Sequence, residues 1–319
     1  MLQEGRDLHI DAVLSNIMVG RNPDGFIADQ LLPVVSVGKQ SNVYYKSNYK
    51  ERLRWTPDLT RRAKGAKSRE VYFSVSSDTY FAKEYALGTR WFDQDVVNAD
   101  DPIRLRTKSA REVTDMLKID YEARIAALAN GATAVGTLTH VATPWSNTTG
   151  SRPFDDLSNI LELFRTSTSQ RANTLIVPEQ VATYLRRSDQ IRDMLFGDKG
   201  GIATDQQIAT LLNVQRILVP TILVNTAGVL ETKIGSGTLA NVWPNKVFVA
   251  YVADLTSAEE QDTWLSAFRW TNPLFAQPWA IRAFKHDDET GSQKVEASYF
   301  QDEKIISADL AIAVDSLIP

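Results

Sequence analysis

The sequence lacks cysteine altogether: none of its 319 residues carries a thiol. This absence excludes a disulfide scaffold, a thiolate metal site and a thiol nucleophile, and it suits a reducing compartment. Long hydrophobic runs are missing too, because the most apolar stretch, residues 217–224, is far shorter than a membrane span and contains Pro220. The first ten residues are polar and do not form a secretory signal. We therefore expect a soluble cytosolic protein with no membrane contact.

Histidine is scarce, and His9, His140 and His286 are too far apart in the sequence to form a recognisable metal motif. Residues 38–41 (Gly-Lys-Gln-Ser) lack the earlier glycine of a phosphate-binding loop. Residues 235–237 (Gly-Ser-Gly) lack the spacing of a nucleophile elbow, which has one residue between the serine and each glycine. The sequence therefore predicts a protein that is not an enzyme and that holds no metal or cofactor.

What the chain does have is charge, divided unequally along its length. Residues 39–69 hold ten Lys or Arg against two acids, a net charge of +8, whereas the whole chain carries −4. The remainder of the chain therefore carries −12. An acidic chain is unsuited to be a general nucleic-acid binder, which is normally basic overall. A basic segment on an acidic body favours binding between copies of the chain.

The basic segment belongs to a predicted β-hairpin. Val43 and Tyr45, later joined by Tyr49, begin one strand, and residues 71–75 alternate as the returning strand. The tip between them is poor in core-forming residues. Such a hairpin cannot bury its tip against its own domain, so we expect it to project and to be ordered by a partner.

A long helix is predicted over residues 102–130. Asp101 is a suitable N-cap, Pro102 fits the first helical position, and Gly131 offers a stop. Apolar residues recur on one face, namely Val113, Leu117, Tyr121, Ile125 and Leu128. At ~1.5 Å per residue this helix is about 43 Å long.

After a second helix over residues 155–165, the chain alternates strands and helices as far as residue 253, which predicts a compact α/β domain. The last part is rich in predicted strands, at residues 279–284, 295–300 and 305–314. Residues 287–315 hold eight acids against two lysines, a net charge of −6. This acidic stretch is a natural complement to the basic hairpin.

In this order, the elements resemble those of the major capsid protein of tailed bacteriophages, which has the Hong Kong 97-type fold. The resemblance lies in the sequence of elements, and it includes the peptide of residues 175–181 (Leu-Ile-Val-Pro-Glu-Gln-Val). It implies an α+β fold with an N-terminal arm, an extended β-hairpin loop, a peripheral domain with a long spine helix, and an axial α/β domain. The corresponding segments are 1–38 (arm), 39–83 (loop), 84–166 (peripheral domain, with the spine helix at about 102–130), 167–253 (axial domain) and 254–319 (return to the peripheral domain).

The resemblance implies a shell protein, and it suggests which residues meet between subunits. Pentamers and hexamers of the chain would assemble in the bacterial host cytoplasm into the icosahedral capsid of a virion, around double-stranded DNA. The extended loop would contact a neighbouring subunit through Tyr45, Tyr49, Arg52, Arg54, Trp55, Arg61, Arg62, Lys64 and Lys67. The acidic surface of the neighbouring subunit that accepts this loop would comprise Asp287, Asp288, Glu289, Glu296, Asp302 and Glu303. A loop at the capsomer centre is expected at Gly197, Lys199 and Gly200.

Further partners follow from the same resemblance: a separate scaffolding protein, a portal and a decoration protein, with packaged DNA touched only weakly and non-specifically. An encapsulin, the shell protein of a cellular nanocompartment with the same fold, is the alternative; the length of this chain and its long basic loop favour a phage. An α/β enzyme built on residues 167–253 is a distant alternative, because no catalytic constellation is found there.

Overall fold

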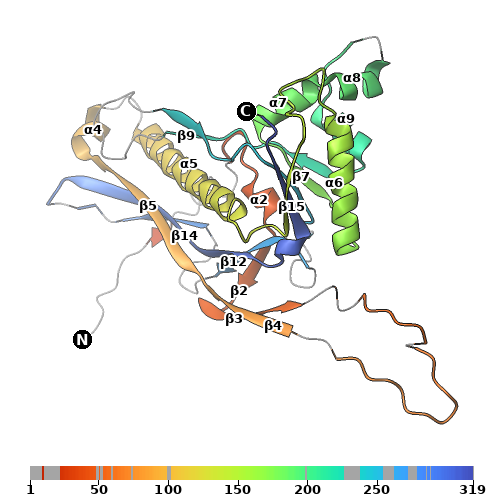
Figure 1. Ribbon diagram of the computed structural model, residues 1–319. Helices are drawn as coiled ribbons and strands as arrows, with labels where there is room; N and C mark the ends of the chain where they lie inside the picture. Colours follow the sequence, from red (N-terminus) through yellow and green to blue (C-terminus); the bar gives the residue numbers. More distant parts are fainter. Residues whose placement is uncertain are drawn as a thin grey trace.

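The structure is a computed structural model. It describes residues 9–10, 22–47, 50, 53–58, 60–72, 75–98, 102–197, 200–225, 238–253, 262–271, 279–284, 286–287 and 289–318. In these residues two larger β-sheets and two smaller β-ribbons are formed, with helices packed against the sheets (Figure 1). Of the helices in this part of the chain, none is both long and apolar enough to cross a bilayer.

The first sheet is organised around the 14-residue strand β14 (Ser292–Ile305). It runs antiparallel to β5, β12 and β13, while β2 lies parallel to β12 and β1 closes the far edge. The bounds of these strands are β1 (His9–Ile10), β2 (Val34–Val37), β5 (Lys83–Phe92), β12 (Leu265–Trp270) and β13 (Trp279–Ala283). Since β2 pairs with β12, part of the predicted N-terminal arm is built into the sheet.

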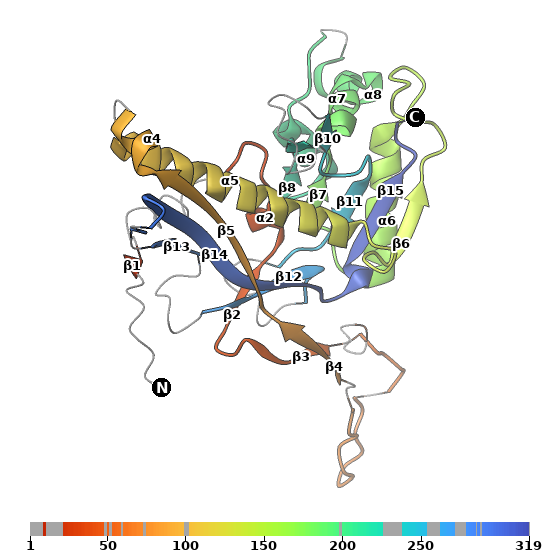
Figure 2. The ribbon, with the colours of Figure 1, turned by 90° about the vertical axis from the view of Figure 1, so that its left-hand side faces the viewer.

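The long helix α5 (Pro102–Ala129) lies across this sheet, along β5 and β14 (Figures 1 and 2). It confirms the helix predicted over residues 102–130. Of its predicted inner face, Leu117, Tyr121 and Ile125 are buried in the main hydrophobic core. The helix is therefore held by packing of one apolar stripe on the sheet, as its sequence period requires.

Two charged side chains on the buried face of α5 anchor the chain segment that precedes β2. Glu122 accepts hydrogen bonds from the backbone N–H groups of Ile27 (3.2 Å) and Ala28 (2.9 Å) at the start of α2 (Ala28–Leu31), and from Trp243 Nε1 (2.7 Å). Lys118, one turn earlier, donates to Asn22 Oδ1 (2.5 Å). Both buried charges thus have partners, as burial demands.

The second sheet has the strand order β6-β15-β11-β7-β8. Helix α6 (Pro153–Thr168) packs on it, and the shorter helices α7, α8 and α9 lie toward one end of the unit (Figure 2). The remaining bounds are β6 (Thr137–His140), β7 (Thr174–Ile176), α7 (Glu179–Arg187), α8 (Asp189–Phe196), α9 (Asp205–Leu212), β8 (Arg216–Leu218), β11 (Val247–Ala250) and β15 (Ala311–Asp315). This confirms an α/β unit in the middle of the chain.

The last strand needs a correction to the sequence-based placement. Residues 305–314 were expected to return to the peripheral domain beside the spine helix, but β15 lies inside the second sheet, antiparallel to β11 and parallel to β6. The physical reason is that residues 311–314 are all buried, so this apolar strand needs cover on both faces. The same holds for β6 and α6, which were predicted in the peripheral domain (84–166) but lie in and against the second sheet. The remaining domain boundaries stay a prediction.

A second correction concerns residues 216–224, whose apolar pattern predicts one strand with an edge or a bulge at Pro220. The structure has two short strands there, β8 and β9 (Leu223–Asn225), with Pro220 between them. Strand β9 leaves the sheet and pairs with β10 (Leu239–Asn241) as a ribbon. Proline lacks the N–H that a ladder needs, which explains the change of partner.

The extended hairpin is formed by β3 (Ser41–Ser47) and β4 (Val75–Phe81), paired in register from Ser41 with Phe81 to Ser47 with Val75. The returning strand therefore begins at Val75 and not at residue 71, so the predicted strand 71–75 is wrong. At the root of the hairpin, the rings of Tyr44 and Tyr80 pack on Phe268 of β12, with centroids 4.8 and 4.7 Å away. Beyond this root, the loop projects from the body (Figure 1).

Candidate inter-subunit surfaces

The projecting hairpin, defined as residues 41–81, exposes large apolar side chains. Trp55 is 79% exposed, and Tyr45, Leu53 and Tyr72 are also exposed. Such residues normally pack in a core or in an interface, and Trp and Tyr are the types that most often carry binding energy between proteins. The hairpin thus presents aromatic side chains that are largely exposed on the subunit.

The cations of the projecting hairpin are only partly paired within the subunit. Arg61 lies 3.7 Å from Asp58, Lys46 pairs with Asp78, and Lys50 pairs with Asp309. Among the residues described, Lys64 and Lys67 are exposed and have no ion-pair partner. Of the predicted contact residues, the structure places the following on this hairpin, with Tyr49 and Arg52 outside the described residues: Tyr45, Arg54, Trp55, Arg61, Arg62, Lys64 and Lys67.

The predicted acidic acceptor surface is only partly present. Glu303 is 8% exposed and bonds Arg124 (3.0 Å), and Glu296 is paired with Arg282 (2.8 Å). Asp302 is mostly buried; it accepts from the backbone N–H of Phe81 and lies 3.3 Å from Lys304. These three carboxylates stabilise the subunit itself. Assigning them to an exposed acceptor surface was therefore wrong.

The remaining predicted acids lie at the other end of β14, where the structure gathers additional carboxylates. Asp287 and Glu289 precede β14, and Asp93 and Asp95 open the short helix α4 (Asp93–Asn98) beside them. The backbone N–H of Asp93 donates to the carbonyl of Gly291 (2.9 Å), which joins the two segments. We call Asp93, Asp95, Asp287 and Glu289 the acidic tip; Asp288 lies outside the described residues.

The acidic tip also carries exposed apolar side chains. Val97 is 83% exposed, Phe92 is half exposed, and no residue of α4 is buried. His286 Nε2 lies 2.9 Å from both carboxylate oxygens of Asp93. A hydrogen bond from Thr290 holds the pKa of Asp287 below its ordinary value, so this carboxylate is charged at neutral pH. The sequence analysis missed Asp93 and Asp95, although two acids between Phe92 and Val97 were a readable signal.

The predicted capsomer-centre loop follows α8. Gly197 and Gly200 have φ angles of 57° and 66°, and a side chain at either position would point into open space. These glycines are needed for backbone conformation, not for close packing. Lys199 lies outside the described residues. The loop is located at one end of the second sheet's unit, while its neighbours in an assembly remain a matter of prediction.

Within the described residues, no group of three or more His, Asp or Glu side chains could hold a metal ion. His140 pairs with Asp315, and His286 pairs with Asp93. The projecting hairpin and the acidic tip both have features of a protein interface.

Comparison with known proteins adds to this geometry. No protein-family model matches the sequence. The major capsid protein of Pseudomonas phage JBD67 is 27% identical over 223 residues, which cover 68% of this chain and 70% of that protein. A phage-related protein of Bordetella bronchiseptica RB50 superimposes with a TM-score of 0.74 at 16% identity, over 98% of this chain and 99% of that one. The chain has the Hong Kong 97-type capsid fold.

The same capsid fold is found in a more distant structure. The capsid of the cyanophage P-SCSP1u matches with a TM-score of 0.58 at 11% identity, over 89% of this chain and 85% of that chain. In the terms of this fold, α5 is the spine helix, the first sheet belongs to the peripheral domain, the projecting hairpin is the extended loop, and the second sheet belongs to the axial domain. The fold predicted from the order of elements is thereby confirmed.

Proposed function

We propose that this chain is the major capsid protein of a tailed phage, and that many copies close into an icosahedral head around double-stranded DNA. The observation that carries the proposal is the projecting hairpin, which combines the exposed side chain of Trp55 with a net charge of +8 over residues 39–69. The capsid fold and the phage JBD67 relative support it. That relative also favours a phage head over a cellular nanocompartment.

The projecting hairpin of one subunit would lie over the peripheral domain of the next, with the acidic tip as its acceptor. Opposite charges would steer the approach, and salt would screen it. Each exposed ion pair contributes only ~0–1 kcal/mol, so the contact also needs apolar burial. Trp55 and Tyr72 on the hairpin, with Phe92 and Val97 at the acidic tip, provide the apolar area.

Other partners follow from the proposed role in a virion. A separate scaffolding protein would guide the curvature of the shell, a portal would occupy one vertex, and a decoration protein would bind outside. Contacts with packaged DNA would be weak and non-specific, because the chain carries a net charge of −4.

Electron microscopy of the purified protein, with sedimentation at low and high salt, tests the proposal. We expect closed shells or capsomer rings that loosen as salt rises. In a second arm of the experiment, a scaffolding protein is added to the chain before the same measurements. A chain that remains monomeric in both arms would overturn the proposal, and closed shells that enclose cellular enzymes without phage DNA would favour the nanocompartment.

The acceptor can be tested separately with the double variant Asp93→Asn/Asp95→Asn. It removes two charges from the acidic tip, so we expect fewer shells at an unchanged subunit fold, measured by sedimentation and circular dichroism. The control is Glu112→Gln, which removes an exposed charge from the spine helix. Equal shell yields from the double variant and the wild type would exclude the acidic tip as the acceptor.

A further inference from the structure

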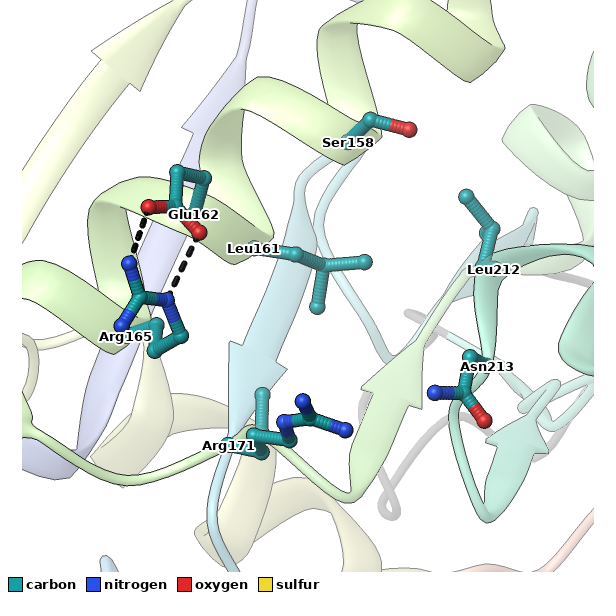
Figure 3. Close-up of a pocket in the computed structure, with 8 residues that line it drawn as sticks. Ser158, Leu161, Glu162, Arg165, Arg171, Leu212 and Asn213 are labelled. Carbon is teal, nitrogen blue, oxygen red and sulfur yellow. Dashed lines mark hydrogen bonds and ion pairs between the residues drawn. The ribbon is translucent and has the colours of Figure 1, made fainter.

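A hollow with a volume of about 290 Å³ opens on the axial domain, between α6, the chain just before β7 and the end of α9 (Figure 3). Leu161 projects from α6 into its centre, and Leu212 and Asn213 face it from α9. Leu161 and Leu212 pack against the hydrophobic core, so the floor of the hollow is apolar and firmly held. A site of this kind suits an apolar side chain with a polar neighbour.

Two arginines bring positive charge to the hollow; within the described residues, one is paired with a carboxylate and the other is not. Arg165 is held by Glu162 through two hydrogen bonds of 2.8 and 2.5 Å, and this pair is neutral overall. Arg171 reaches beneath Leu161 toward Asn213, and it has no ion-pair partner among the described residues (Figure 3). The hollow therefore has one uncompensated guanidinium beside an apolar floor. A carboxylate next to an apolar side chain is the matching ligand.

The axial domain also presents the matching features, at the end of α8 and just before α9. Ile202 is 72% exposed and Met194 is about half exposed. Asp193 is exposed and has no ion-pair partner in the described part of the chain. Arg192 Nε of α8 donates to the carbonyl of Gly201 (3.0 Å), which ties the residues just before α9 to α8. An acid and two apolar side chains are thus displayed at the end of this unit.

The hollow and Ile202 lie at opposite ends of α9, since Ile202 precedes the helix and Asn213 follows it. A head-to-tail contact requires two different, complementary surfaces on one subunit. Such contacts close into a ring when the rotation that relates one subunit to the next is a whole-number fraction of a full turn. We propose that the hollow receives the end of α8 and Ile202 of a second copy of this chain, with Arg171 binding Asp193. This inference rests on the proposed shell function and identifies the contact that would join axial domains within a capsomer.

The absence of cysteine allows a direct test by cross-linking. In the variant Ile202→Cys/Asn213→Cys, a short bis-maleimide should join neighbouring copies into a ladder that ends at five or six subunits on a denaturing gel. The matched control is Ile202→Cys/Leu163→Cys, because Leu163 is exposed on α6 but does not line the hollow. Shells visible by microscopy without this ladder, or an equal ladder from the control, would overturn the inference and leave the shell function standing.

A charge exchange gives a second readout. Arg171→Asp should reduce the yield of capsomers at least several-fold, and Arg171→Asp/Asp193→Arg should restore most of it, because the pair is re-formed with its signs reversed. Both residues are exposed, so the subunit should fold in every variant. A double variant that is no better than Arg171→Asp would contradict the pairing. A wild-type chain that never assembles would overturn both this inference and the shell function.

Discussion

At the scale of single residues, Glu122 shows how a buried carboxyl group can join distant parts of the chain. It lies on the inner face of the spine helix, where its carboxylate holds the start of α2 and the indole of Trp243. The sequence predicted the buried stripe of this helix, but it could not predict the partners of Glu122. Those partners come from residues about a hundred positions away on either side, and no periodic pattern records such contacts.

Burial raises the pKa of Glu122 to about 7, against an ordinary value of 4.5. The folded chain therefore keeps this proton where the unfolded chain has lost it. The contribution of Glu122 to stability is full below about pH 4.5 and is lost as the pH rises to about 7. We expect Glu122→Gln, which has no proton to lose, to remove a pH-dependent change of about 3 kcal/mol.

Urea unfolding of the unassembled subunit, followed by tryptophan fluorescence from pH 4 to pH 8, measures this change. Lys118 and Asp29 are the nearby charged groups and are kept in every variant. Glu112→Gln, on the exposed side of the same helix, should retain the wild-type pH dependence. An unchanged slope in Glu122→Gln would show that another group is responsible.

At the scale of elements, the sequence predicted that a hairpin forms, but it did not predict where its returning strand begins. The tip is basic and poor in core-forming residues, and this predicted a projecting loop. The start of the returning strand was not predicted: β4 begins at Val75, which pairs with Ser47. The register depends on the packing of Tyr44 and Tyr80 against Phe268, a residue of a distant strand. In the same way, the break at Pro220 was visible in the sequence, whereas the new pairing of β9 with β10 was not.

The pairing of Ser47 with Val75 allows the projecting loop to be removed cleanly. We expect a variant in which Asn-Gly replaces residues 48–74 to fold with a melting temperature within about 2 °C of wild type, because the described side chains removed are exposed. Its shells should be absent. Circular dichroism and electron microscopy give the two readouts, and normal shells from the shortened chain would refute the role of the hairpin.

At the scale of the whole molecule, charge is separated between a basic loop and an acidic body. The sequence established this separation by simple counting, and the resemblance of element order predicted the fold. Counting could not tell which acids are free, because Glu296 and Glu303 are neutralised by arginines that come from β13 and α5. The acidic tip became visible only when α4 was placed beside the start of β14.

The charge separation predicts how assembly depends on salt. Replacing Arg61, Arg62, Lys64 and Lys67 with serine halves the net charge of residues 39–69, from +8 to +4. We expect assembly at low salt to be roughly 10-fold slower and less sensitive to added NaCl, as followed by light scattering. The charge-conserving variant Arg61→Lys/Arg62→Lys should behave as wild type. A neutralised loop with unchanged salt dependence would exclude electrostatic steering.

The strand pairing also constrains the order in which the chain can fold during synthesis. Strand β2 pairs with β12, β5 pairs with β14, and β6 pairs with β15. Each pair joins an early segment to a late one, so neither sheet can be completed until residues beyond 290 have left the ribosome. Long-range pairing of this kind makes folding slow and leaves apolar strands uncovered for a time. We therefore expect the nascent chain to need protection from aggregation until its last strands have been made.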